Sequence, residues 1–152
     1  MRREGYTLVE VLISVLLVGI LALVAVGNFR RDAEPRAVDR SAWRLAAALR
    51  HARAQAISES RPVHVCFNSS NGLLQTWVDR DADYVADPGE SRRDEIYQHP
   101  WVRVSAAPTS GVFGADGCCD TVTRPWRFEV GLGVSTQRVF VLPTGRTLRE
   151  ET

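Results

Sequence analysis

The sequence predicts an α+β protein in which a long N-terminal helix packs on a small, mainly antiparallel β-sheet head. Two patterns support this prediction. Residues 6–61 read as helix, first apolar and then amphipathic, and beyond Pro62 short β-like runs alternate with turns. A chain of 152 residues, 45% apolar and 24% charged, has room for one globular domain with an appendage.

The composition excludes several classes of function. With 19 basic and 18 acidic residues the formal net charge is +1, so the total charge predicts no strong affinity for polyanions. Every basic residue is Arg, which excludes Schiff-base and P-loop lysines. The three His and three Cys are too scattered for a zinc finger, and no nucleophile elbow or phosphate loop is recognisable. We predict that the protein is not an enzyme and has no cofactor.

The run at residues 6–28 is apolar except for Glu10. As a helix it would be about 34 Å long, enough to cross a hydrocarbon core of about 30 Å. We predict a single-pass membrane anchor, whose orientation the arginines on both sides of the run do not settle. A cleaved secretory signal peptide, with a site near residues 22–25, is the alternative. A lone carboxylate in such a helix costs about 2–3 kcal/mol to insert, so Glu10 is expected to have a function.

The string G-Y-T-L-V-E, from Gly5 to Glu10, is followed at once by an uncharged run. This combination resembles the class III leader of type IV pilins and type II secretion pseudopilins. The resemblance implies that residues 1–5 are a leader, that a prepilin peptidase cleaves between Gly5 and Tyr6, and that the new N-terminus is methylated. It also implies that Glu10 neutralises the terminal amine of a neighbouring subunit, since neither charge is tolerated alone in an apolar bundle. The alternative is a stray carboxylate near the membrane interface.

Residues 29–61 are predicted to form the amphipathic half of the helix. Apolar residues recur at spacings of three and four, and arginines occupy the other faces. Pro35 indicates a break or a first turn between the two halves. The run R-L-A-A-A-L-R-H-A-R-A-Q-A-I resembles the GspH/FimT branch of pilin-like proteins, which contains minor pseudopilins and minor type IV pilins. The resemblance implies assembly with other pilins or pseudopilins in a filament. Before assembly it implies a single-pass position in the inner membrane, with the head on the periplasmic or extracellular side.

Residues 62–152 are predicted to form the β-rich head. Asn71-Gly72 and the segment 143–145 fit hairpin turns. The run R-V-F-V-L-P-T-G-R is similar to the F-x-P-x-G-R close of the same branch. The expected strands are Val63–Phe67, Leu73–Val78, Glu95–Tyr97, Val102–Ser105, Trp126–Val130 and Arg138–Leu142.

An acidic segment, D-R-D-A-D-Y-V-A-D-P-G-E, matches a calcium-loop template at positions 1, 3, 5, 9 and 12. Hard carboxylate oxygens at this spacing can surround Ca²⁺. Against a calcium site, Tyr84 stands at position 6 instead of the glycine that allows the sharp turn, and the flanks read as strands. A solvated acidic hairpin tip is therefore the preferred interpretation. The template residues are Asp79, Asp81, Asp83, Asp87 and Glu90.

The three cysteines leave two interpretations open. In an exported head, oxidation is expected, and Cys66 would pair with Cys118 or Cys119, leaving one thiol. The alternative is that all three remain unpaired.

DNA uptake is the alternative function. Some FimT-type minor pilins bind DNA through arginines that follow a G-R motif near the C-terminus. Here G-R-T-L-R supplies Arg146 and Arg149, and Arg138 is expected nearby, but Glu150 and Glu151 weaken the positive charge. Guanidinium groups suit the phosphates of double-stranded DNA. Residues 30–61 are also basic, and we expect that surface to face other subunits. The sequence favours a structural filament subunit, with this tail as a neutral surface segment.

Overall fold

The computed structural model describes residues 7–81, 83–97, 102–120 and 125–151, without the side chains of residues 24–33 and 151. The chain divides into two compact units, Met1–Glu34 and Pro35–Thr152. The leader at residues 1–5, with the predicted cleavage site between Gly5 and Tyr6, lies outside the described residues.

Helix α1 spans Leu8–Glu59 and includes Pro35. The predicted break at this proline is therefore wrong. Proline removes one backbone donor, and the hydrogen bonds on both sides of it continue the helix. The helix begins after Thr7, whose Oγ1 accepts a hydrogen bond from the Glu10 amide at 3.3 Å. This is the N-cap half of a T-x-x-E capping box, a start signal visible in the sequence.

The apolar side chains of residues 8–23 are exposed in this chain. Within the part of the chain that is described, no helical stretch combines the length and the hydropathy that a membrane crossing requires. The predicted anchor at residues 6–28 stays a prediction.

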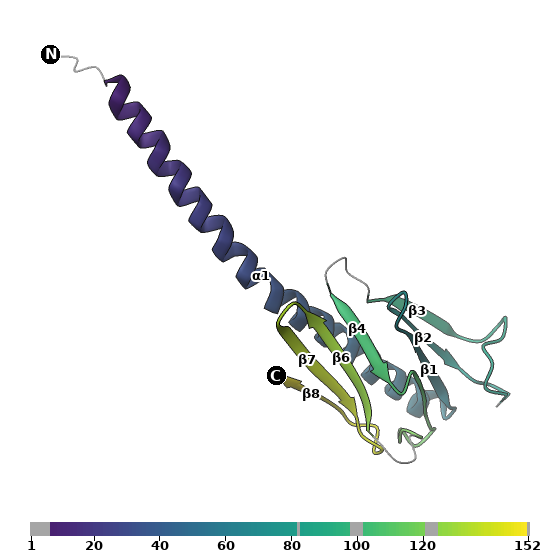
Figure 1. The fold of residues 1–152 in the computed structure, drawn as a ribbon. Coiled ribbons are helices and arrows are strands. Elements are labelled where there is room, and N and C mark those ends of the chain that lie inside the picture. The colour runs from purple at the N-terminus through teal and green to yellow at the C-terminus, as the bar shows by residue number, and fades with distance from the viewer. Residues whose placement is uncertain (1–6, 82, 98–101, 121–124, 152) are drawn as a thin grey trace. The chain divides into compact units, whose positions relative to one another are not determined.

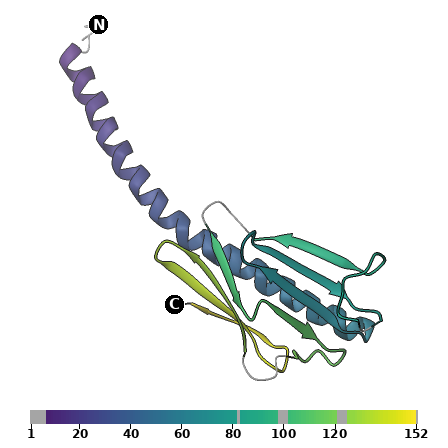
Figure 2. The same ribbon diagram turned by 45° about the vertical axis from the view of Figure 1, so that its right-hand side comes forward.

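Among the described residues of the second unit, eight strands form two antiparallel sheets (Figures 1 and 2). The first sheet has the order β3-β2-β1-β5 and the second the order β4-β6-β7-β8. The strands are β1 Val63–Asn68, β2 Leu73–Val78, β3 Arg92–Ile96, β4 Arg103–Ala107, β5 Ser110–Phe113, β6 Trp126–Leu132, β7 Ser135–Val141 and β8 Thr147–Glu151. The predicted α+β architecture, with a long helix and an antiparallel head, is confirmed.

The six expected strands are present, Leu73–Val78 with the predicted ends and the other five with shifted ends, and two further strands were not predicted. Both hairpins occur: β1 pairs with β2 through Gly72 at φ 65°, and β7 pairs with β8 through Gly145 at φ 73°. Strand β5 was missed because four residues beginning Ser-Gly carry little β pattern. Strand β8 was taken for a solvated tail because its sequence, T-L-R-E-E, is mostly charged. Pairing with β7 decides its conformation.

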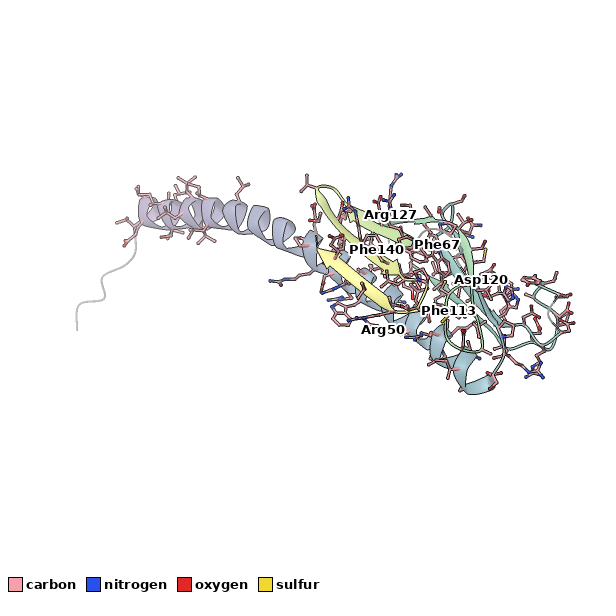
Figure 3. All side chains as sticks on the ribbon, turned by 90° about the horizontal axis from the view of Figure 1, so that it is seen from below. Arg50, Phe67, Phe113, Asp120, Arg127 and Phe140 are labelled. Atoms are coloured by element: carbon pink, nitrogen blue, oxygen red, sulfur yellow. The ribbon has the colours of Figure 1, made fainter. Side chains whose placement is uncertain are left out.

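One core joins the second half of α1 to both sheets. Alanines and leucines on one face of the helix are buried against apolar residues of the strands, and Phe67 and Phe113 lie in this interior (Figure 3). The rings of Phe67 and Phe128 meet edge to face at 5.8 Å, across the two sheets. A Cβ on Gly111 would lie 3.1 Å from the Trp126 ring, so this glycine allows the close approach. The helical core residues are Val38, Ala42, Leu45, Ala46, Leu49, Ala52 and Ala56.

Candidate functional site

The first candidate site is the start of α1, where Glu10 lies in the first turn. Its carboxylate is exposed and has no hydrogen bond or ion pair with any described residue. Its main chain has ordinary helical partners, including the Ser14 hydroxyl, which donates to the Glu10 carbonyl at 2.8 Å. Among the described residues, therefore, none neutralises this carboxylate.

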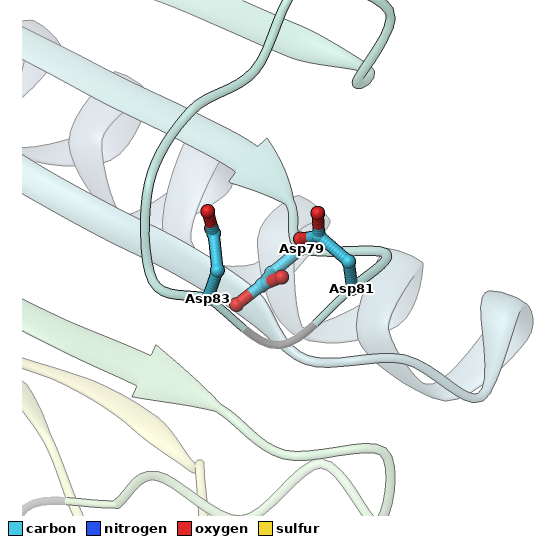
Figure 4. A group of neighbouring side chains, drawn as sticks. All are labelled: Asp79, Asp81 and Asp83. Carbon is cyan, nitrogen blue, oxygen red and sulfur yellow. The ribbon is translucent and has the colours of Figure 1, made fainter.

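The acidic loop, residues 79–90, joins β2 to β3 and is the second candidate. Asp79, Asp81 and Asp83 each place one carboxylate oxygen within 4.8 Å of the others (Figure 4). Their environments differ, because Asp79 is buried whereas Asp81 and Asp83 are exposed. Partial desolvation and the charge of Asp83 raise the pKa of Asp81. Three of the five template carboxylates thus form one group.

Glu90, another template residue, acts on the loop backbone instead. It accepts hydrogen bonds from the Arg80 amide at 2.7 Å and from the Asp87 amide at 3.1 Å. Asp83 likewise accepts from the Val85 amide at 2.8 Å. These bonds hold the loop in a defined shape through its own carboxylates, which agrees with the surface-hairpin interpretation.

Tyr84 makes the turn that the template assigns to glycine. Its φ is 67°, in the left-handed region that a non-glycine residue rarely adopts. Two contacts compensate: the Tyr84 amide donates to Asp79 Oδ2 at 3.1 Å, and its ring lies edge-on to His64 at 5.1 Å. His64 in turn lies 3.0 Å from Asp79 Oδ2 and stacks on Trp77. The expectation that Tyr84 prevents the sharp turn is therefore wrong.

The third candidate is a groove of about 640 Å³ between α1 and β8. Four arginines line it, and we call it the arginine groove: Arg50 and Arg53 come from α1, and Arg146 and Arg149 from the end of the chain. No lining residue is acidic. The sequence predicted two of these arginines, and tertiary packing adds the other two.

The four guanidinium groups are held differently. Arg149 pairs with Asp39 and lies 4.7 Å from the centre of the Trp43 ring, and Arg50 lies 5.8 Å from the same ring. Arg53 donates from Nε to the Gly117 carbonyl at 2.9 Å. Arg146 is exposed and has no polar partner among the described residues.

Arg138, the third predicted DNA-binding residue, does not line the groove. It lies on β7, with its Nε 3.4 Å from Glu129 Oε1, and it is opposite Glu150 in the pairing with β8. Two carboxylates near this guanidinium reduce its attraction for an anion. The structure therefore separates Arg138 from Arg146 and Arg149.

The structure does not bring the cysteines together. Cys66 and Cys118 are free thiols, and Cys66 lies opposite Ser110 at the start of β5. Cys119 bridges Phe113 at the other end of the same strand. Strand register, which the sequence spacing does not reveal, thus places Cys66 and Cys119 at different ends of β5, and a disulfide from Cys66 to Cys118 or Cys119 stays a prediction. A hydrogen bond with Asp116 raises the pKa of the exposed Cys118 thiol, which makes it less nucleophilic at neutral pH.

Three functional features escaped sequence reasoning. Arg50 and Arg53 were visible only as part of a basic helix, without a sign that they meet the C-terminal strand. His64 was noted only as lacking metal-ligand spacing, although it orders the acidic loop through Asp79. Thr7 had a recognisable signal, since a Thr three residues before a Glu, at the start of an apolar run, marks a helix N-terminus.

A long helix with an exposed apolar first part, packed through its second part on antiparallel sheets, defines a pilin-like filament protein. Residues 41–145 match the family model of the type II transport protein GspH, and residues 1–26 match the prokaryotic N-terminal methylation motif. The chain belongs to the GspH family. The family match and the N-terminal motif confirm the predicted resemblance to type IV minor pilins and pseudopilins.

Solved structures show the same fold. The type IV minor pilin FimU of Pseudomonas aeruginosa is 17% identical, with a TM-score of 0.60 over 74% of this chain and 87% of FimU. The minor pseudopilin EpsH from the type 2 secretion system of Vibrio cholerae is 12% identical, with a TM-score of 0.57 over 75% of this chain and 96% of EpsH. No curated protein sequence matches the chain.

Proposed function

We propose that the protein is a minor structural subunit of a type IV pilus or a type II secretion pseudopilus. It is inserted in the inner membrane, processed between Gly5 and Tyr6 by a prepilin peptidase, methylated, and assembled into the filament through the first part of α1. It has no enzymatic role. The single observation that carries the proposal is the exposed apolar stretch at residues 8–23, with the unpartnered Glu10 carboxylate in its first turn.

The physical argument concerns what such a surface needs. Contiguous exposed apolar area of this kind is stable only against lipid or against other apolar helices. The same helix can therefore exchange a bilayer for a filament core. Glu10 is tolerated in that core if a cation neutralises it, and the terminal amine of a neighbour at Tyr6 supplies that charge. The pair then also fixes the register between subunits.

The test is incorporation of Glu10→Ala into filaments, with Ser14→Ala as the control one turn further along the same helix. We expect Glu10→Ala to reduce the filament-associated fraction by about a hundredfold, because an unpaired buried amine remains, and Ser14→Ala to assemble normally. Mass spectrometry of the processed chain should show a methylated N-terminal Tyr6. Normal assembly of Glu10→Ala would refute the proposed pairing.

DNA uptake is the second candidate, and the arginine groove is the observation that favours it. Guanidinium groups from α1 and β8 can contact successive phosphates, and filament avidity strengthens weak contacts. The test is a mobility-shift titration of the chain with double-stranded DNA at low and moderate salt. Binding that falls with salt and with Arg146→Ala supports DNA uptake, and equal binding by Arg138→Ala would agree with its place outside the groove.

For the acidic loop we propose a surface role without a metal. Glu90 and Asp79 already accept hydrogen bonds that order the loop without a metal. Calorimetric titration with Ca²⁺ tests this: we expect no saturable heat, whereas stoichiometric binding lost in Asp81→Asn would show a calcium site.

A further inference from the structure

We propose that the arginine groove binds the acidic loop of a second copy of the same chain, in a head-to-tail contact between neighbouring heads. This inference rests on the proposed filament function and requires that two copies of this minor subunit lie next to each other in the filament. The occupant is residues 79–90 of the next subunit.

The first argument is charge. Three of the four groove arginines, Arg50, Arg53 and Arg146, have no acidic partner among the described residues. The acidic loop presents the opposite surface, with exposed carboxylates at Asp81 and Asp87. Arg–carboxylate contacts are bidentate and set orientation as well as attraction.

The second argument is apolar complementarity within the same surfaces. Ile57 and Leu148, which line the groove, are 47% and 37% exposed. The tip of the acidic loop carries Tyr84 and Val85, 69% and 55% exposed. An interface that combines a small apolar centre with a charged rim is the usual pattern of protein recognition. A groove of about 640 Å³ accommodates two such side chains.

The third argument is an unfulfilled hydrogen bond. Thr147 lines the groove and is only 7% exposed, yet its Oγ1 has no hydrogen-bond partner. Buried hydroxyls are normally paired, because leaving one unpaired costs about 1–3 kcal/mol. A carboxylate or backbone carbonyl from an inserted loop provides an acceptor for it.

The geometry of the head favours contact between two molecules. The acidic loop follows β2 on the first sheet, whereas β8 is an edge strand of the second, and they lie on opposite sides of the head (Figures 1 and 2). Groove and loop are different patches, so the contact is heterologous and repeats from copy to copy. The loop is also ordered in advance by Asp79 and Glu90, so little conformational entropy is lost on binding.

The same observations favour a peptide over DNA in this groove. Exposed Ile57 and Leu148 gain nothing from contact with a phosphate backbone, whereas apolar side chains such as Tyr84 and Val85 can pack against them. Protein side chains of mixed character match the lining better.

The experiment measures self-association of the full chain in detergent by sedimentation, at low salt. A groove variant, Arg50→Ala with Arg146→Ala, is compared with a loop variant, Asp81→Asn with Asp87→Asn, and none of these side chains has a hydrogen bond that holds the head. Arg103→Ala, an exposed arginine on β4, is the matched control. The apolar helix is common to all variants, so differences report the head alone.

We expect each double variant to weaken association by about tenfold or more, and Arg103→Ala to behave as the wild type. An equimolar mixture of the two variants should form dimers and stop there, because one intact groove meets one intact loop and no further contact remains. Unchanged association of either double variant, or higher oligomers in the mixture, would overturn the proposal.

Groove-dependent binding of double-stranded DNA without self-association would also overturn it, and would favour nucleic acid as the occupant. The assay needs neither peptidase nor filament. If the self-association assay shows no groove-to-loop contact, the Glu10→Ala incorporation assay still tests the proposed filament function. If Glu10→Ala assembles normally, the contact between heads can still be measured by sedimentation.

Discussion

The two parts of helix α1 have the same conformation and opposite environments. At residues 8–23 the apolar side chains are exposed, Leu16 by 65%, whereas between residues 38 and 56 the core positions are buried, Leu49 completely. The second part finds its apolar partner in the two sheets of its own chain. The first part has no described partner within the chain, so its burial depends on other molecules. One helix thus serves the fold with one half and, as proposed, assembly with the other.

Truncation of a leucine in each half gives the largest contrast. Leu49→Ala leaves a cavity between helix and sheets and should lower the free energy of unfolding by about 3–5 kcal/mol. Leu16→Ala should leave head stability unchanged. Denaturant unfolding in detergent, followed by tryptophan fluorescence, measures both, and equal effects would contradict the division between the halves.

Two glycines extend the comparison to the backbone. Gly145 has φ 73°, and an added Cβ would collide with the Gly117 carbonyl, so Gly145→Ala should destabilise the head by about 2–3 kcal/mol. Gly19 lies within α1 and a Cβ there meets nothing within 4 Å. Gly19→Ala should not alter the unfolding midpoint of the head. A stable Gly145→Ala would show that the β7–β8 turn can be remodelled.

Tyr97 joins β3 to the second half of the helix. Its hydroxyl lies 2.6 Å from Glu95 Oε2 and 3.2 Å from the Arg44 carbonyl oxygen. Tyr97→Phe should cost about 1 kcal/mol at neutral pH.

The same contact predicts a pH dependence. Burial, followed by the hydrogen bond to Glu95, raises the pKa of Tyr97 above its usual 10.0. A raised pKa means that stability is constant below the unfolded value and falls as pH rises beyond it. Unfolding measured from pH 7 to 11 should therefore show a decline above about pH 10 that is smaller in Tyr97→Phe. If stability falls equally steeply with pH in the wild type and in Tyr97→Phe, the decline is caused by a group other than Tyr97.

The smallest effect is expected on the solvent face of β3. Arg92 Nε lies 2.9 Å from Asp94 Oδ1, and this hydrogen bond holds the pKa of Asp94 below its usual range. The pair's contribution is present above the unfolded pKa and is lost as pH falls through the folded value. Both groups are exposed and screened by solvent, so Arg92→Ala should leave the midpoint of unfolding at neutral pH nearly unchanged. NMR titration should show the Asp94 pKa returning toward normal.

Several features were predictable because they depend on local pattern. The start of α1, the amphipathic face with Leu45 and Leu49, the β1–β2 hairpin at Gly72 and the turn at Gly145 follow from side-chain spacing and backbone preference. The charged strand β8 was not predictable, since its β conformation comes from pairing with β7. The break predicted at Pro35 was wrong because a local signal was overridden: a helix that is established on both sides of a proline continues although one backbone hydrogen bond is lost.

The sequence by itself determined the helix with its two chemical halves, the position of Glu10, the acidic loop and most strands, because each depends on residues that are close along the chain. Only the tertiary structure decided which distant groups meet. It places Arg50 of α1 and Arg146, which directly precedes β8, in one groove, brings Asp79 to His64, and separates Cys66 from Cys119. These outcomes depend on strand register and helix-to-sheet packing, which many weak contacts determine together.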